Sequence, residues 1–369
     1  MINKAVRLKM VERVSKSKTK RNMIHLEVLR MIAIFLVLFN HTGQDGFMYF
    51  VVAQKSIFYP VYLFISILDK VAVPLFFMIS GALLLNKEEQ IRTIYKKRIS
   101  RILIVLISIS FIIYIVEECS FHFSQMDIKT FLLLIYQKPI HTRLWYLYSY
   151  LGILVMLPLL RKMAKAMTID EYRYFMLCHV AIFGLIPVFE YLLSCGQVCI
   201  TSRFDPDLVT SYSIFYFLVG YYFENLLDKD LYNIKTVIVA NFWGIGAILL
   251  SCYVTHYYIQ VTGDGNPQKF HNCLIAIPTI AVYITIKYIF LKISLKDRIQ
   301  QLIQVVGSTT FGIYLLENWY RGWTRWIYEF LLPYIGSFLA CFFWILAACV
   351  VGGFATAVLK KIPVIGQII

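Results

Sequence analysis

An arginine and a histidine lie eleven residues apart in one long apolar segment, IHLEVLRMIAIFLVLFNH, at residues 24–41. A helix turns about 100° per residue, so Arg30 and His41 share one stripe, roughly 16 Å apart along the axis. A charge inside a membrane span costs at least a few kcal/mol, which makes it a candidate functional group. The pattern therefore predicts a helix face with a cation at depth and an imidazole near its far end.

A late segment, GSTTFGIYLLENWYRGW, brings a carboxylate to the level expected for His41. Tyr314 and Glu317 lie three residues apart and are expected to share a face of one helix, with Tyr314 as a candidate substrate contact. A pair between Glu317 and His41 would fix the ring tautomer and stabilise the protonated ring, as a general base requires. Asp69 and Glu190, also expected toward the outer side, are the competing partners.

Two arginines on a basic loop are candidates for binding a phosphate. Arg98 and Arg101, in KKRISR, lie three residues apart and share a face if a helix begins there. Guanidinium groups bind phosphate bidentately, although arginines on such a loop also serve as topology markers. In the preceding segment, VPLFFMISG, the Ser80-Gly81 pair is small enough to let two helices approach closely.

Aromatic and acidic residues mark candidate substrate contacts. Trp145 and Tyr146, in RLWYLYSYL, form either an interfacial aromatic belt or a surface that stacks on sugar rings. Asp69 and Lys70 interrupt the second apolar segment, and Pro74 follows them. We expect this span to be kinked or to line a polar cavity, where such groups can be satisfied.

The elements that hold these residues must be membrane helices. Of the 369 residues 59% are hydrophobic and only 15% are charged, with a mean hydropathy of +0.68, which is typical of a polytopic membrane protein. The net charge of +15 comes from Lys and Arg clustered between apolar runs. This arrangement indicates membrane topology rather than nucleic-acid binding.

Apolar runs long enough to cross a bilayer predict an all-α bundle of about ten transmembrane helices. The basic tail, residues 1–22, and the alternate basic loops predict that both termini are cytoplasmic, and residues 23–369 are expected to form one membrane domain. The first span lacks a signal-peptide cleavage site and is expected to remain in the protein. The expected spans are 24–43, 60–85, 101–117, 144–161, 173–194, 208–226, 234–256, 270–292, 302–320 and 335–358.

The cysteines and short motifs exclude several kinds of site. Most cysteines are scattered in or near spans, as small buried hydrophobes. Cys195 and Cys199, in SCGQVC, form either a local disulfide or two free thiols. The chain has no HExxH, P-loop or Rossmann glycine pattern, so no metal, nucleoside triphosphate or NAD is expected.

Taken in order, these motifs resemble those of acyltransferase family 3, a family of integral membrane proteins. The resemblance covers most of the chain and rests on five elements: the pattern from Arg30 to His41, FFMISG, RxxR at Arg98 to Arg101, LWYL and the late GIYLL. It implies a ten-span enzyme that moves acyl groups, usually acetyl from acetyl-CoA, onto surface or lipid-linked glycans. It further implies an essential histidine at His41, with Arg30 and the RxxR arginines supporting catalysis or acyl-CoA binding, and Ser80 in a motif near them.

The chain departs from this family at one position. The late element often reads YLxH in the family, whereas Glu317 stands here where a histidine is expected. We expect acyl-CoA to be a donor substrate rather than a resident cofactor, with its phosphates at the inner arginines and its thioester near His41, which acts as general base or acyl carrier. A secondary transporter and a noncatalytic membrane sensor or scaffold are the alternatives; many transporters show paired broken helices, and none is found here.

Overall fold

A computed structural model describes residues 23–118, 127–193, 211–263 and 273–368, and the regular secondary structure of these residues is helical, with no strand among them. The basic tail, Cys195 and Cys199 lie outside the described residues. Several helices continue directly into short π-helical turns, as α7 does into Tyr114–Glu118 and α13 into Tyr222–Leu226. The α-helices are α2 (Ile24–Asn40), α3 (Tyr49–Val52), α4 (Tyr59–Asp69), α5 (Ala72–Leu84), α6 (Ile91–Thr93), α7 (Ser100–Ile113), α8 (Ile128–Gln137), α9 (Trp145–Ala166), α10 (Ile169–His179), α11 (Ile186–Leu193), α13 (Tyr212–Tyr221), α14 (Ile234–Thr262), α15 (Ala276–Lys292), α16 (Asp297–Leu315), α17 (Glu317–Leu359) and α18 (Pro363–Ile368).

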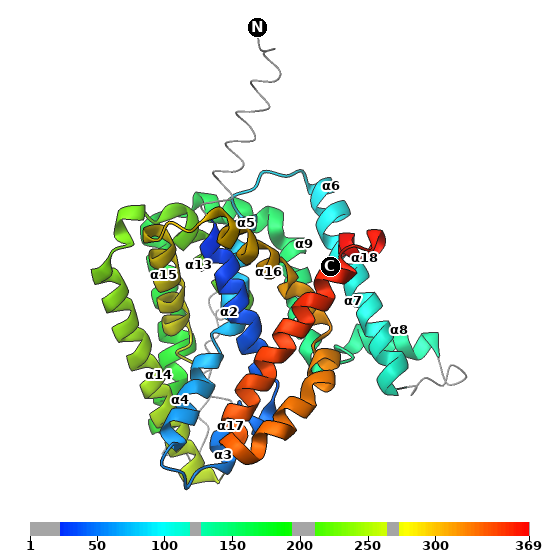
Figure 1. Cartoon of the computed structure of the whole chain (residues 1–369). Coiled ribbons are helices and arrows are strands. Elements are labelled where there is room, and N and C mark those ends of the chain that lie inside the picture. Colours follow the sequence, from blue (N-terminus) through cyan, green and yellow to red (C-terminus); the bar gives the residue numbers. More distant parts are fainter. Residues whose placement is uncertain (1–22, 119–126, 194–210, 264–272, 369) are drawn as a thin grey trace.

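Six helical stretches in the described part of the chain are long and apolar enough to cross a membrane. They are Tyr59–Leu84, Ile91–Val116, Thr142–Ala166, Ile169–Glu190, Ile234–Thr262 and Glu317–Leu359. The expected spans at 24–43, 208–226, 270–292 and 302–320 correspond to shorter or more polar helices, α2 and α15 having 17 residues each. Ten crossings therefore stay a prediction. The start of α2 and the position of α18 lie toward the same end of the bundle (Figure 1).

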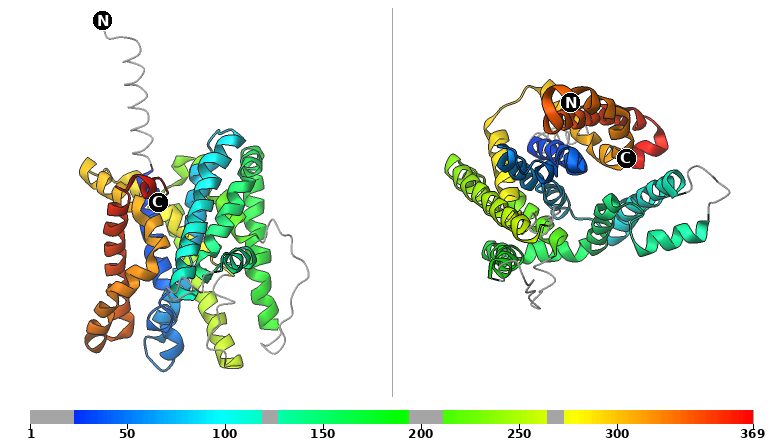
Figure 2. Two further views of the ribbon diagram at one scale, coloured as in Figure 1. Left: turned by 90° about the vertical axis from the view of Figure 1, so that its right-hand side faces the viewer. Right: turned by 90° about the horizontal axis from the view of Figure 1, so that it is seen from below.

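Helix α2 occupies the centre of the bundle and packs against α4, α5, α15, α16 and α17. Seen along the bundle, α2 has α16 and α17 on one side and the α14–α15 pair on another (Figure 2). Its apolar residues Leu26, Leu29, Ala33 and Leu38 are buried against these neighbours. Because so many elements contact it, the direction of the Arg30–His41 face is fixed by packing.

Two glycines set the position of α5. A Cβ atom on Gly81 would overlap the backbone oxygen of Phe217 on α13, and one on Gly220 would overlap the backbone oxygen of Met78. The backbones of α5 and α13 therefore approach closely, as the small-residue interpretation of Ser80-Gly81 predicts. Ser80, the residue before Gly81, lies about 100° away around α5 and so on a different face.

The chain breaks at three places that matter for the site. Helix α4 ends at Asp69 and α5 begins at Ala72, which confirms the kink predicted in the second span. Leu316, with φ −112° and ψ 14°, separates α16 from α17. Gly336, at φ 76°, divides α17 into two legs that fold back on each other, which only glycine permits without strain (Figure 1).

Candidate active site

A cavity of about 410 Å³ lies against α2, α5, α7, α9 and α16. It falls within the range of ordinary small-molecule sites. Residues distant in the sequence are gathered on its wall. Seven of them are candidate site residues that the sequence predicts: Arg30, His41, Ser80, Arg101, Trp145, Tyr146 and Tyr314.

The face of α2 that lines the cavity is the predicted stripe. Arg30, Val37 and His41 all contribute to the wall, at the spacing i, i+7 and i+11. These positions return to nearly the same angle around a helix. One rigid element therefore supplies both the cation and the imidazole, at opposite ends of the cavity.

At one end of the cavity, His41 pairs with Glu317 as predicted. The Nδ1 atom of His41 lies 2.8 Å from Oε1 and 3.0 Å from Oε2 of Glu317, whose side chain is 4% exposed. Asp69 instead accepts a hydrogen bond of 2.9 Å from Asn40, and Glu190 lies on α11. Because the Nδ1 atom is taken by the carboxylate, Nε2 is the nitrogen that remains for a substrate.

One expectation about Glu317 is wrong. Tyr314 and Glu317 do not share a face of one continuous helix, because α16 ends at Leu315 and Glu317 is the first residue of α17. The break at Leu316 changes the direction of the chain between them. Both side chains still reach the His41 end of the cavity: the Tyr314 hydroxyl donates to the backbone oxygen of Arg143 at 2.7 Å.

Arg143 is the neighbour of the pair that sequence reasoning missed. Its Nη1 atom lies 3.2 Å from Oε1 of Glu317, and it lines the main cavity as well as a smaller one bounded by Glu317, Asn318 and Trp319. A buried carboxylate is stabilised when a cation contacts it. Its only signal in the sequence was its place directly before LWYL.

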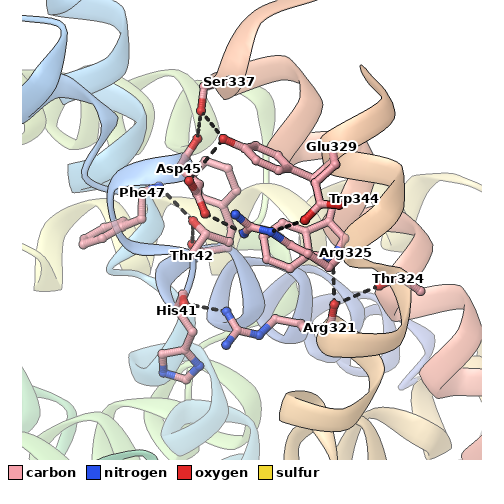
Figure 3. Close-up of polar contacts among 12 residues, drawn as sticks. His41, Thr42, Asp45, Phe47, Arg321, Thr324, Arg325, Glu329, Ser337 and Trp344 are labelled. Carbon is pink, nitrogen blue, oxygen red and sulfur yellow. Dashed lines mark hydrogen bonds and ion pairs between the residues drawn. The ribbon is translucent and has the colours of Figure 1, made fainter. Parts of the chain in front are cut away.

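The backbone beyond α2 is tied to α17. Arg321 donates from Nη1 to the backbone oxygen of His41. Asp45 pairs with Nη1 of Arg325 at 2.6 Å, and its backbone oxygen accepts from Ser337 at 2.8 Å. Figure 3 shows this network above the imidazole, which points away from it. The network fixes the end of α2 and so the position of the ring.

At the other end of the cavity, Arg30 is held by a carboxylate on its own helix. Its Nη1 atom donates to Oε1 and Oε2 of Glu27 at 2.7 and 2.9 Å. A Cβ atom on Gly307 would overlap the same carboxylate, so this glycine lets α16 approach Glu27. The spacing of Glu27 and Arg30, i and i+3, was available in the sequence as a signal for this pair.

The two arginines of RxxR take different positions. Arg101 lines the cavity, whereas Arg98 is absent from its lining. Arg98 instead donates two hydrogen bonds to Glu89, at 2.7 and 2.9 Å, and Arg161 adds a third at 2.7 Å. The bond from Arg98, together with Arg161, lowers the pKa of Glu89 to about 2. A phosphate-binding role for Arg98 stays a prediction.

Two aromatic residues at the start of α9 take different positions at the cavity. Tyr146 stacks on Tyr150 with ring centroids 5.9 Å apart and meets Tyr314 edge-on at 5.8 Å. Trp145 is 42% exposed and lies at the cavity surface. Tyr146 is thus part of the packed wall, and Trp145 is the one free to contact a larger molecule.

Comparison with known proteins gives one match. A family model described as an acyltransferase domain, of the third acyltransferase family, matches residues 23–354. No curated protein and no solved structure matches the chain.

Proposed function

The chain belongs to acyltransferase family 3, and we propose that it transfers an acyl group, acetyl in the first instance, from cytosolic acyl-CoA to a hydroxyl group of a surface or lipid-linked glycan. The observation that carries this proposal is the cavity that joins Arg30 and Arg101 at one end to the His41–Glu317 pair at the other. A noncatalytic scaffold on the same fold would not need such a cavity.

The cavity suits the shape of acyl-CoA. Its nucleotide end is a polyanion, and guanidinium groups are well suited to bind phosphate. Between the arginines and His41 the wall includes the apolar side chains of Ile102, Phe76 and Phe311. The thin pantetheine arm would lie along this stretch, so that the thioester reaches His41.

The chemistry then requires one proton carrier and one site for negative charge. Nδ1–H of His41 donates to Glu317, and Nε2 accepts the proton of the acceptor hydroxyl. The oxygen attacks the thioester carbon, and the tetrahedral intermediate collapses with loss of the CoA thiolate, which takes the proton from the imidazolium. We assign Arg143 to stabilise the oxyanion, because it lines the same end of the cavity.

His41 could also carry the acyl group itself. In that case Nε2 attacks the thioester, releases CoA and passes the acyl group to the hydroxyl in a second step. Rapid quenching with radiolabelled acetyl-CoA in the absence of acceptor separates the two routes: protein-bound label that His41→Ala abolishes supports a carrier, and its absence supports a general base.

The test of the function uses cells and liposomes. Surface glycans of a producing strain are compared by mass spectrometry with and without the protein, and a mass difference names the acyl group and the acceptor. In liposomes, His41→Ala should reduce acetyl-CoA-dependent transfer at least about 1,000-fold while the protein still inserts and accumulates.

His256→Ala is the matched control, because His256 hydrogen-bonds Tyr59 at 3.0 Å and lies outside the cavity wall. It should transfer at the wild-type rate. Activity retained in His41→Ala would refute the proposed mechanism.

A further inference from the structure

Lys360 lies at the end of the cavity that holds Arg30 and Arg101. It directly follows the last residue of α17, and its Nζ atom donates to the backbone oxygen of Ser308 on α16 and to Oγ of the same residue at 3.3 Å. It lines the cavity together with both arginines. Three separate parts of the chain, α2, α7 and the end of α17, thus bring a cation to one place.

The positive charge of Lys360 is held by neutral groups in the part of the chain that the structure describes. Both oxygens that Lys360 contacts are neutral, and no ion pair of Lys360 is found in the part of the chain that the structure describes. The nearby carboxylate of Glu27 is engaged by Arg30. Burial lowers the pKa of Lys360, as do Arg101 and Arg30, with Glu27 opposing them. An anion between these cations would relieve their repulsion.

We propose that Lys360 binds the phosphate groups of the acyl-CoA donor, exchanging its contacts with Ser308 for phosphate oxygens. This inference rests on the proposed function, because it assigns a further residue to the donor site. An ammonium group suits this role, since it offers three donors on a flexible stem and can follow a phosphate into the cavity. Lys360 lies beyond residue 354, where the family match ends.

The fold gives Lys360 a defined position. The second leg of α17 runs from the turn at Gly336 back to the end of the bundle where α2 begins (Figure 1). Helix α18 then packs against α7, the helix that carries Arg101. Lys360 is therefore held at both sides, between a long helix and a docked one.

Calorimetric titration of the intact protein in detergent with CoA tests the proposal. Lys360→Ala should raise the Kd for CoA about tenfold, the usual size of one lost hydrogen bond to a charged group. Lys361→Ala is the matched control, because Lys361 is the exposed neighbour and is not part of the wall of this cavity. It should bind CoA as the wild type does.

Two further measurements separate loss of charge from loss of structure. Lys360→Arg should restore affinity to within about threefold, because it keeps a cation at this position. The affinity of Lys360→Ala should also fall less steeply with rising salt than that of the wild type, since one charged contact is missing. Equal CoA affinity in Lys360→Ala and wild type would overturn the inference alone, whereas a wild type that does not bind CoA would overturn the donor in the proposed function.

Discussion

Replacing Glu317 by glutamine tests the pairing at the centre of the site. An amide keeps the size of the side chain, and its oxygen can still accept a hydrogen bond from Nδ1 of His41. What is lost is the negative charge that stabilises the imidazolium formed when His41 takes the proton. Glu317→Gln therefore isolates the electrostatic part of the interaction.

The structure sets the size of the expected effect. The contact between Nδ1 and Oε1 is 2.8 Å, and the centres of the two delocalised charges are about 4 Å apart, which gives about 4 kcal/mol at an effective dielectric constant of about 20. Arg143, at 3.2 Å from the same oxygen, offsets part of this attraction. A net loss of about 2 to 3 kcal/mol remains, which lowers the rate about 30- to 150-fold.

The assay is release of CoA from acetyl-CoA by protein in liposomes, with glycan from producing cells as acceptor. Glu329→Gln, the same change on an exposed residue of α17 with a distant contact of 3.8 Å to Arg325, should leave the rate unchanged. A Glu317→Gln rate within threefold of wild type would refute the reasoning.

Two other changes test ion pairs away from His41, one at Arg30 and one at Glu89. Arg30→Lys should raise the KM for acetyl-CoA about tenfold, because lysine cannot contact both Glu27 and a phosphate with a rigid fork; an unchanged KM in steady-state kinetics would show that charge alone suffices. Glu89→Gln should lower the stability by about 1 kcal/mol at pH 6. Because the pKa of Glu89 is lowered to about 2, its contribution is complete above its ordinary value of 4.5 and is lost as the pH falls toward 2. Thermal unfolding in detergent should therefore show the difference between wild type and Glu89→Gln shrinking steadily as the pH falls from 4.5 toward 2, and a constant difference over this range would contradict the assignment.

Features that depend on one helix could be predicted from the sequence. The stripe of Arg30 and His41 follows from the helical period alone, and the break after Asp69 follows from two charges and a proline in an apolar run. The pairing of His41 with Glu317 was also found, because both were expected at the same depth in the membrane. Depth along a span is set by counting residues.

Features that depend on the tertiary arrangement could not be predicted in this way. Arg98 and Arg101 are three residues apart and chemically identical, yet Arg98 pairs with Glu89 whereas Arg101 lines the cavity. The place of Lys360 at the cavity could not be predicted, because nothing in the local sequence shows that the end of α17 returns to α16. The helix break at Leu316 could not be predicted either, because the local sequence YLLEN contains no proline or glycine.

Arg30 and His41 are held at a fixed distance from each other because one helix, α2, positions both. Eleven residues of helix fix their separation along the axis at roughly 16 Å, and the helices packed around α2 prevent that length from changing. On the proposed mechanism, a donor must therefore span this length between its anionic group and its thioester. Acetyl phosphate, whose acyl and phosphate groups are adjacent, cannot satisfy both ends, whereas a donor with a long arm can. On this mechanism, the length of one helix discriminates between acyl donors by the length of their arm, whatever acyl group they bear.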